Sequence, residues 1–209
     1  MKNQRTELIF ILDRSGSMSG LESDTIGGFN AMLEKQKKEA GECRITTVLF
    51  DSQYELLHDR VDIDKVKPIT EKDYFVRGST ALLDAMGKTM HKIERVQQCE
   101  PSRVLMVIIT DGEENSSREY QLETIKMKVK FLKEKSWEFI FLGANMDAVT
   151  TAGHMGIDPH HAVDYVADSE GTELNFKVMS DAVSNFRSSG FVPPESLEDI
   201  RCDVEKRRG

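Results

Sequence analysis

Short apolar runs alternate with helical patterns along almost the whole of this 209-residue chain, and few folds accommodate that alternation. Residues 8–12 and 104–109 are continuously apolar, as in strands that are buried on both faces of a sheet. Residues 45–50, 139–142 and 162–166 give further strand patterns, and helical spacing separates most of them. The chain is therefore predicted to be an α/β protein with an open, doubly wound, mostly parallel sheet and helices on both faces.

One pair of strands is expected to run in opposite directions. Residues 45–50 and 54–58 both have strand patterns, and only Asp51, Ser52 and Gln53 separate them. A parallel crossover needs a dozen or more residues, which this turn does not provide. The second and third strands are therefore predicted to form an antiparallel hairpin.

The last strong helical pattern, which includes Leu174, Val178 and Phe186, ends near residue 187. Beyond Ser188 the chain contains two consecutive prolines and mixed charges. We predict one domain over residues 1–187 and a charged C-terminal tail over residues 188–209 that is partly disordered.

The charge balance narrows the range of partners. The chain has 28 Lys and Arg residues against 36 Asp and Glu residues, a net charge of −8, and its one short basic run is residues 206–208. Nucleic acids and anionic membranes both require a basic face, so neither is an expected partner. No membrane-spanning run or secretory signal is evident, and the three cysteines lack the spacing of a disulfide framework. A cytoplasmic location is expected.

Short side chains with oxygen atoms follow the two most strongly buried strand patterns and precede one helix. In doubly wound sheets, ligands bind at the carboxyl ends of the strands, where the winding reverses. Hard cations such as Mg²⁺ prefer oxygen ligands. The candidate metal ligands are Asp13, Ser15, Ser17, Thr80 and Asp111.

Three of these five groups are neutral hydroxyls. If both aspartates act partly through water, the cation keeps most of its charge, and its open position should capture a carboxylate from a partner. Each segment also has an ordinary structural explanation. The serines after Asp13 can cap a helix, the turn at Asp111 is a common loop, and Thr80 can cap the helix that begins near Ala81.

Asp13-x-Ser15-x-Ser17, the distant Thr80 and Thr110-Asp111-Gly112 together resemble the metal-ion-dependent adhesion site of von Willebrand factor type A (vWA) domains. The chain is similar to stand-alone bacterial vWA proteins of uncharacterised role, over about residues 6–187. The resemblance implies a Rossmann-like sheet in the order 3-2-1-4-5-6, with strand 3 antiparallel. It also implies that Ser15, Ser17 and Thr80 bind the cation directly, whereas Asp13 and Asp111 act mainly through water.

The resemblance implies a non-enzymatic protein-binding module in which bound Mg²⁺, or Mn²⁺, captures a Glu or Asp carboxylate of a partner protein. Arg14, Arg77 and Ser79 would lie on the rim and set specificity. The alternative is a metal-dependent phosphoesterase that uses the same cation site and Asp13. Such phosphatases carry Asp-x-Asp after the first strand, whereas position 15 is a serine here, and no glycine-rich phosphate loop is present.

Three charged residues near these ligands have two open interpretations each. Arg14 is expected either to steer a partner carboxylate or to pair with a surface acid such as Glu113. Glu113 and Glu114 either add negative charge beside the cation or are solvated residues at the start of a loop.

Overall fold

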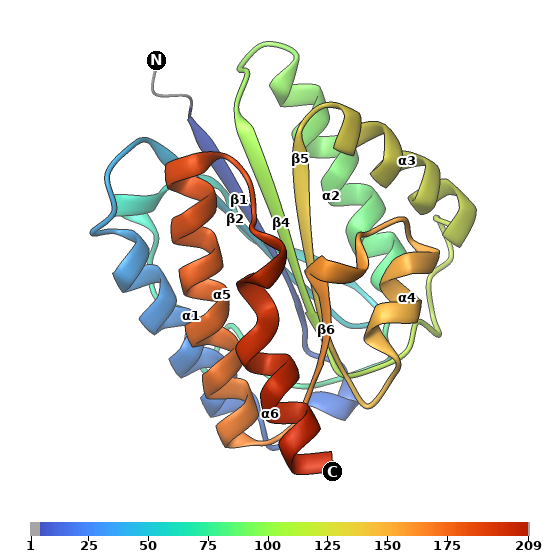
Figure 1. Ribbon diagram of the computed structural model, residues 1–209. Helices are drawn as coiled ribbons and strands as arrows, with labels where there is room; N and C mark the ends of the chain where they lie inside the picture. Colours follow the sequence, from blue (N-terminus) through green and yellow to red (C-terminus); the bar gives the residue numbers. More distant parts are fainter. Residues whose placement is uncertain (1–4, 209) are drawn as a thin grey trace.

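A computed structural model describes residues 5–208, and within them six strands form a single sheet (Figure 1). The sheet order is β3-β2-β1-β4-β5-β6, and all neighbouring strands are parallel except β2 and β3. The predicted fold class, strand order and antiparallel hairpin are therefore confirmed. The strands are β1 (Thr6–Asp13), β2 (Cys43–Phe50), β3 (Tyr54–Asp62), β4 (Arg103–Thr110), β5 (Trp137–Ala144) and β6 (Ala162–Tyr165).

Helices cover both faces of the sheet, as Figure 1 shows. One face packs against α1, α5 and α6, and the other against α2, α3 and α4. Within residues 5–208, no helix combines the length and the apolar character needed to cross a bilayer. The helices are α1 (Glu22–Gln36), α2 (Leu82–Gln97), α3 (Leu122–Glu134), α4 (Ala148–His154), α5 (Ser169–Ser189) and α6 (Glu198–Arg208).

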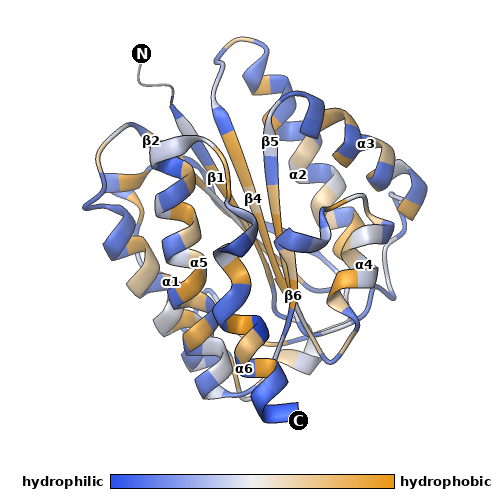
Figure 2. Ribbon diagram, viewed as in Figure 1, coloured by the Kyte–Doolittle hydropathy of each residue, from blue (hydrophilic) through white to orange (hydrophobic). Residues whose placement is uncertain are grey.

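The central strand β1 explains why its sequence is continuously apolar. Leu8, Phe10 and Leu12 enter the core on the α1–α5 side, whereas Ile9 and Ile11 enter the core on the α2–α3 side. Successive side chains of a strand point to opposite faces, so both sets are buried when both faces are covered. Figure 2 shows the resulting apolar colour concentrated on the strands and on the inner sides of the helices.

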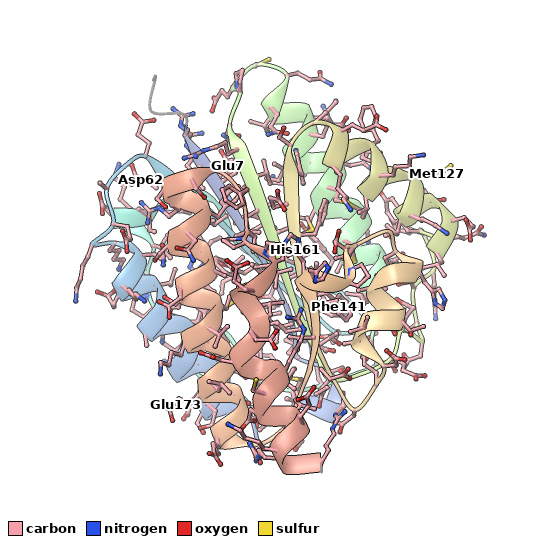
Figure 3. All side chains as sticks on the ribbon, viewed as in Figure 1. Glu7, Asp62, Met127, Phe141, His161 and Glu173 are labelled. Atoms are coloured by element: carbon pink, nitrogen blue, oxygen red, sulfur yellow. The ribbon has the colours of Figure 1, made fainter. Side chains whose placement is uncertain are left out.

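The edge strand β3 is irregular. Its pairing with β2 shifts register on either side of Thr47, and Arg60 has a left-handed backbone conformation with φ of 50°. The guanidinium of Arg60 lies 2.6 Å from Oε1 of Glu7, a buried residue on β1 that is labelled in Figure 3. This ion pair joins the bulged part of the edge to the central strand.

The C-terminal segment differs from the predicted loose tail. The predicted boundary at residue 188 falls inside α5, and a short 3-10 turn at Pro194–Leu197 leads directly into α6. Leu197 and Ile200 are buried in the core on the α1–α5 side, and the guanidinium of Arg201 donates to the carbonyl oxygen of His160 at 2.6 Å. Two well-placed apolar side chains hold the segment although the sequence around them is highly charged. Residues 1–4 and 209 of the predicted ranges lie outside the described residues.

Candidate metal centre

The sheet places both candidate aspartates at one edge. β1 and β4 are parallel neighbours, and Leu12 pairs with Ile109. Asp13, the last residue of β1, and Asp111, directly after β4, therefore lie at the same end of the sheet. The winding of the chain reverses between these two strands. Asp13 is 1% exposed and Asp111 is 2% exposed, so both carboxylates are almost fully buried.

The three candidate hydroxyls converge beside the aspartates. Ser15 Oγ lies 3.0 Å from Ser17 Oγ, and Thr80 Oγ1 donates to Ser15 Oγ at 3.1 Å. A Cβ atom on Gly112 would lie 2.8 Å from Thr80 Oγ1, 3.1 Å from Ser17 Oγ and 3.6 Å from Ser15 Oγ. The absence of a side chain at Gly112 therefore leaves a small space that three hydroxyl oxygens surround.

Asp13 holds the loop that carries the two serines. Its Oδ1 accepts a hydrogen bond from the backbone N–H of Ser15 at 2.7 Å, and its Oδ2 accepts one from the Thr110 hydroxyl at 2.5 Å. Burial raises the pKa of Asp13 to about 6, although both hydrogen bonds act in the opposite direction. The charged form of Asp13 is therefore costly in the protein without a cation.

Asp111 has a different environment. Among the described residues, neither of its carboxylate oxygens has a hydrogen-bond partner. Burial raises the pKa of Asp111 above its ordinary value, although the nearby Ser17 hydroxyl and the backbone N–H of Asp111 act in the opposite direction. Because a buried carboxylate without a partner is strongly disfavoured, a cation at this point would supply the interaction that the protein does not. The oxygen-only donor set and this unpartnered carboxylate fit a hard divalent cation.

Hydrogen bonds between loops fix the positions of these groups. The Tyr74 hydroxyl donates to the carbonyl oxygen of Asp13 at 2.5 Å. The backbone N–H of Thr80 donates to Oδ1 of Asn115 at 3.0 Å, so the Thr80 backbone is tied to the loop that follows Asp111. The Thr80 hydroxyl itself faces Ser15, so it does not act as the predicted helix cap.

Arg14 is not the rim residue that the sequence suggests. Its side chain is completely buried, with Nε 2.9 Å from Oδ2 of Asp51 and Nη2 2.7 Å from Oε2 of Glu55. Its acidic partners are therefore in and after the β2–β3 turn, and Glu113 is not one of them. Arg77, which is exposed, also pairs with Asp51 at 2.8 Å. The sequence pattern did not single out Asp51 as the shared partner of Arg14 and Arg77. Its position directly after β2 nevertheless puts it at the same end of the sheet as Asp13 and Asp111.

Glu114 is engaged at the start of α2. Its Oε2 accepts from the backbone N–H of Leu83 at 2.9 Å, and its Oε1 accepts from the N–H groups of Ser116 and Ser117 at 2.9 and 2.7 Å. A carboxylate at a helix N-terminus is stabilised by the free N–H groups there. Glu114 therefore has a structural role, whereas Glu113 is solvent-exposed.

The strand order, with polar side chains at the point where the winding reverses between β1 and β4, is that of a Rossmann-like α/β protein. The sequence matches no protein-family model and no curated protein. Solved structures with the same fold include mussel byssus proximal thread matrix protein 1 with a zinc-occupied MIDAS motif, at a TM-score of 0.62 and 13% identity, over 87% of this chain and 46% of that one. Manganese-loaded TRAP protein from Plasmodium vivax gives a TM-score of 0.60 and 18% identity, over 83% of this chain and 74% of that protein. A von Willebrand factor type A protein from Catenulispora acidiphila gives a TM-score of 0.57 and 12% identity, over 87% of this chain and 43% of that protein.

The chain therefore has the fold of a von Willebrand factor type A domain. It spans less than half of the length of the mussel protein.

Proposed function

We propose that this chain is a non-enzymatic, divalent-cation-dependent protein-binding module. Mg²⁺, or Mn²⁺, is held directly by the hydroxyls of Ser15, Ser17 and Thr80, and Asp13 and Asp111 act mainly through water. A Glu or Asp side chain of a partner protein completes the coordination.

The observation that carries this proposal is the buried, unpartnered carboxylate of Asp111 beside three converging hydroxyls. Hydroxyls bring no charge, so a cation held mainly by them stays strongly positive and favours an anionic ligand at its open position. A site with more carboxylates in direct contact would neutralise the ion and weaken that preference.

The similar structures support a divalent cation at this place in the fold. One is described as manganese-loaded, and another has zinc in its MIDAS motif. These proteins are less than 20% identical to this chain, so the identity of the cation is proposed from the donor set: hard oxygen ligands favour Mg²⁺ or Mn²⁺ over zinc.

A phosphoesterase mechanism receives no comparable support. Both oxygens of Asp13 accept hydrogen bonds within the protein, and the residue is almost completely buried, which disfavours it as a nucleophile. The position where related chemistry uses a second aspartate is Ser15, which cannot serve as a general acid.

Cation binding is tested by thermal unfolding with Mg²⁺, with Mn²⁺ and with a chelator. The wild-type melting temperature should rise with either ion, because a ligand that binds only the folded state stabilises it. Thr80→Val keeps the side-chain shape but removes one hydroxyl, so the cation affinity should fall at least about tenfold. Thr89→Val is the matched control, since the Thr89 hydroxyl is also buried but bonds the carbonyl oxygen of Ala85 within α2. A wild-type protein that responds to neither ion contradicts the proposal.

Carboxylate capture is tested by selecting peptides from a random display library in Mg²⁺ and releasing them with chelator. The recovered peptides should share an Asp or Glu, and replacing that residue by Asn or Gln should abolish binding. Recovery of peptides without acidic residues, or binding that persists in chelator, would count against carboxylate capture even if the cation site exists.

A further inference from the structure

An exposed aromatic ring lies in the loop that precedes Thr80. Phe75 is 43% exposed, although the backbone of its loop is well anchored by hydrogen bonds. Its neighbour Tyr74 is buried and donates its hydroxyl to the backbone of Asp13, one of the candidate ligands. The residue next to Phe75 in the chain is therefore tied directly to the candidate metal centre.

The other end of the same loop is fastened to the serine-bearing loop. The backbone N–H of Arg77 donates to the carbonyl oxygen of Arg14 at 2.8 Å, and the N–H of Gly16 donates to the carbonyl oxygen of Gly78 at 3.2 Å. Gly16 stands between Ser15 and Ser17, so residues 74–78 form the wall next to the proposed cation.

Two guanidinium groups hold the ring of Phe75 in place. The Cζ atoms of Arg14 and Arg77 lie 5.4 and 5.3 Å from the ring centroid, at cation–π distance. Both guanidinium groups also bind the same Oδ2 atom of Asp51, at 2.9 and 2.8 Å. The ring is thus oriented before any partner arrives, so Phe75 loses little side-chain entropy when a partner packs on it.

Among the described residues, five large apolar side chains are exposed, and Phe75 is the one in a loop bonded to the candidate ligands. Met127 and Phe131 lie on α3, Val149 on α4 and Phe191 after α5. Figure 3 shows Met127 at the outer side of α3, far along the molecule from the edge where β1 and β4 end. Rigid aromatic side chains beside a polar anchor are typical of interface hot spots.

We propose that Phe75 is a specificity-determining residue: the partner segment that offers a carboxylate to the cation also places an apolar side chain on the Phe75 ring. The exposed guanidinium of Arg77 beside the ring disfavours Lys or Arg at that position of the partner. This inference rests on the proposed function, and it specifies the partner as an acidic residue with an aliphatic or aromatic residue close to it in the bound segment.

The test repeats the Mg²⁺-dependent peptide selection with wild-type protein, Phe75→Ala and Phe131→Ala. Phe131 is the matched control, because it is 42% exposed and its ring also lies within cation–π distance of two lysines, Lys128 and Lys135. Wild type and Phe131→Ala should select an apolar residue next to or near the acidic residue, and Phe75→Ala should select the acidic residue alone. A wild-type peptide should bind Phe75→Ala at least about tenfold more weakly, with unchanged Mg²⁺ affinity.

The outcomes separate this inference from the proposed function. If wild type selects no Mg²⁺-dependent acidic peptide, the proposed function fails and this inference fails with it. If all three proteins select the same peptides with equal affinity, the role of Phe75 is refuted while the proposed function stands. If Phe75→Ala loses its fold or its Mg²⁺ affinity, Phe75→Gln replaces it, because the longer side chain still covers Arg14 but offers a polar surface; the apolar preference should again be lost.

Discussion

Asp13 and Asp111 are two buried carboxylates whose charges oppose each other when no cation is present. The charge of Asp111 contributes to the raised pKa of Asp13, after the larger effect of burial. In the metal-free protein this arrangement reduces stability, and the proposed cation would offset that cost. The candidate site therefore trades stability for binding, as functional sites commonly do.

Asp13→Asn should stabilise the metal-free protein while removing its response to metal. The amide oxygen still accepts from the N–H of Ser15, and the Thr110 hydroxyl, 3.1 Å from the carbonyl oxygen of Gly112, can turn its proton toward that group. At pH 8 in chelator, the free energy of unfolding in urea should rise by about 1–3 kcal/mol. Mg²⁺ should no longer raise the melting temperature.

The difference in stability between wild type and Asp13→Asn should depend on pH. The pKa of Asp13 in the folded protein, about 6, exceeds its ordinary value of 3.8, so the folded state binds this proton more tightly than the unfolded state. The stability from this group is complete below pH 4 and is lost as the pH rises through 6. The advantage of Asp13→Asn should therefore shrink between pH 7 and pH 4, and a constant difference would contradict the assigned cause.

Gly112→Ala should weaken cation binding without unfolding the protein. The new Cβ would lie 2.8 Å from Thr80 Oγ1 and 3.1 Å from Ser17 Oγ, so it would fill the space between the hydroxyls. The Mg²⁺ affinity, measured by calorimetry, should fall at least about tenfold. Gly153→Ala is the control, because a Cβ there has no neighbour within 4 Å among the described residues and lies in α4. Equal Mg²⁺ affinity for both variants would place the cation elsewhere.

At the scale of elements, the strands and the main helices were predictable because their apolar periodicity reflects burial directly. The ion pairs of Arg14 were not, because they depend on the register that sets Asp13 opposite Phe50 and so brings Arg14 beside Asp51. The docking of α6 was also missed, since Leu197 and Ile200 form no periodic pattern. The convergence of Asp13 and Asp111 was predictable because β1 and β4 end side by side, whereas the position of Thr80 depends on contacts between loops. That these side chains bind a cation stays a prediction.

Asp84 in the first turn of α2 should stabilise the loop before α3 in a pH-dependent way. Burial acts to raise the pKa of Asp84. The pKa is nevertheless lowered, because the carboxylate accepts hydrogen bonds from the backbone N–H groups of Arg118, Glu119 and Tyr120 at 2.9–3.0 Å. Asp84→Ala should cost about 1–3 kcal/mol of unfolding free energy at pH 7.

A lowered pKa means that this stabilisation is present above the ordinary value of 3.8 and is lost as the pH falls through the folded-state pKa. The difference between wild type and Asp84→Ala in urea unfolding should therefore shrink at pH 3. Glu123→Ala, at an exposed position in the first turn of α3, should have little effect at either pH and serves as the control.

Ile200→Ala tests whether α6 is part of the folded core. The Ile200 side chain is buried, so removing most of it should cost about 2–4 kcal/mol of unfolding free energy. Glu205→Ala, at an exposed position of the same helix, should be nearly neutral. If both variants unfold at the same urea concentration as wild type, α6 contributes nothing to the core. The melting-temperature shift with Mg²⁺ should be equal in all three proteins.

At the scale of the whole molecule, the net charge of −8 repels an acidic partner as it approaches. The proposed carboxylate contact is short-range, whereas repulsion between the two negative molecules acts over a Debye length, about 10 Å at 0.1 M salt. With Mg²⁺ saturating, the association rate of an acidic peptide should therefore rise between 20 and 200 mM NaCl, as measured by stopped-flow fluorescence. A rate that falls with salt would show that the local positive field of the cation and Arg77 dominates.

The irregular edge at β3 also affects how copies of the molecule meet. An open edge strand offers unpaired backbone groups on which another chain can build, and this is a common route to aggregation. Here the bulge around Thr47 and the left-handed Arg60 interrupt the regular spacing of those groups. A second copy that paired regularly along the whole of this edge would have to straighten the strand at Arg60, whose guanidinium is bound to Glu7. The ion pair that fastens Arg60 therefore makes the β3 edge less suited to regular pairing with a second copy.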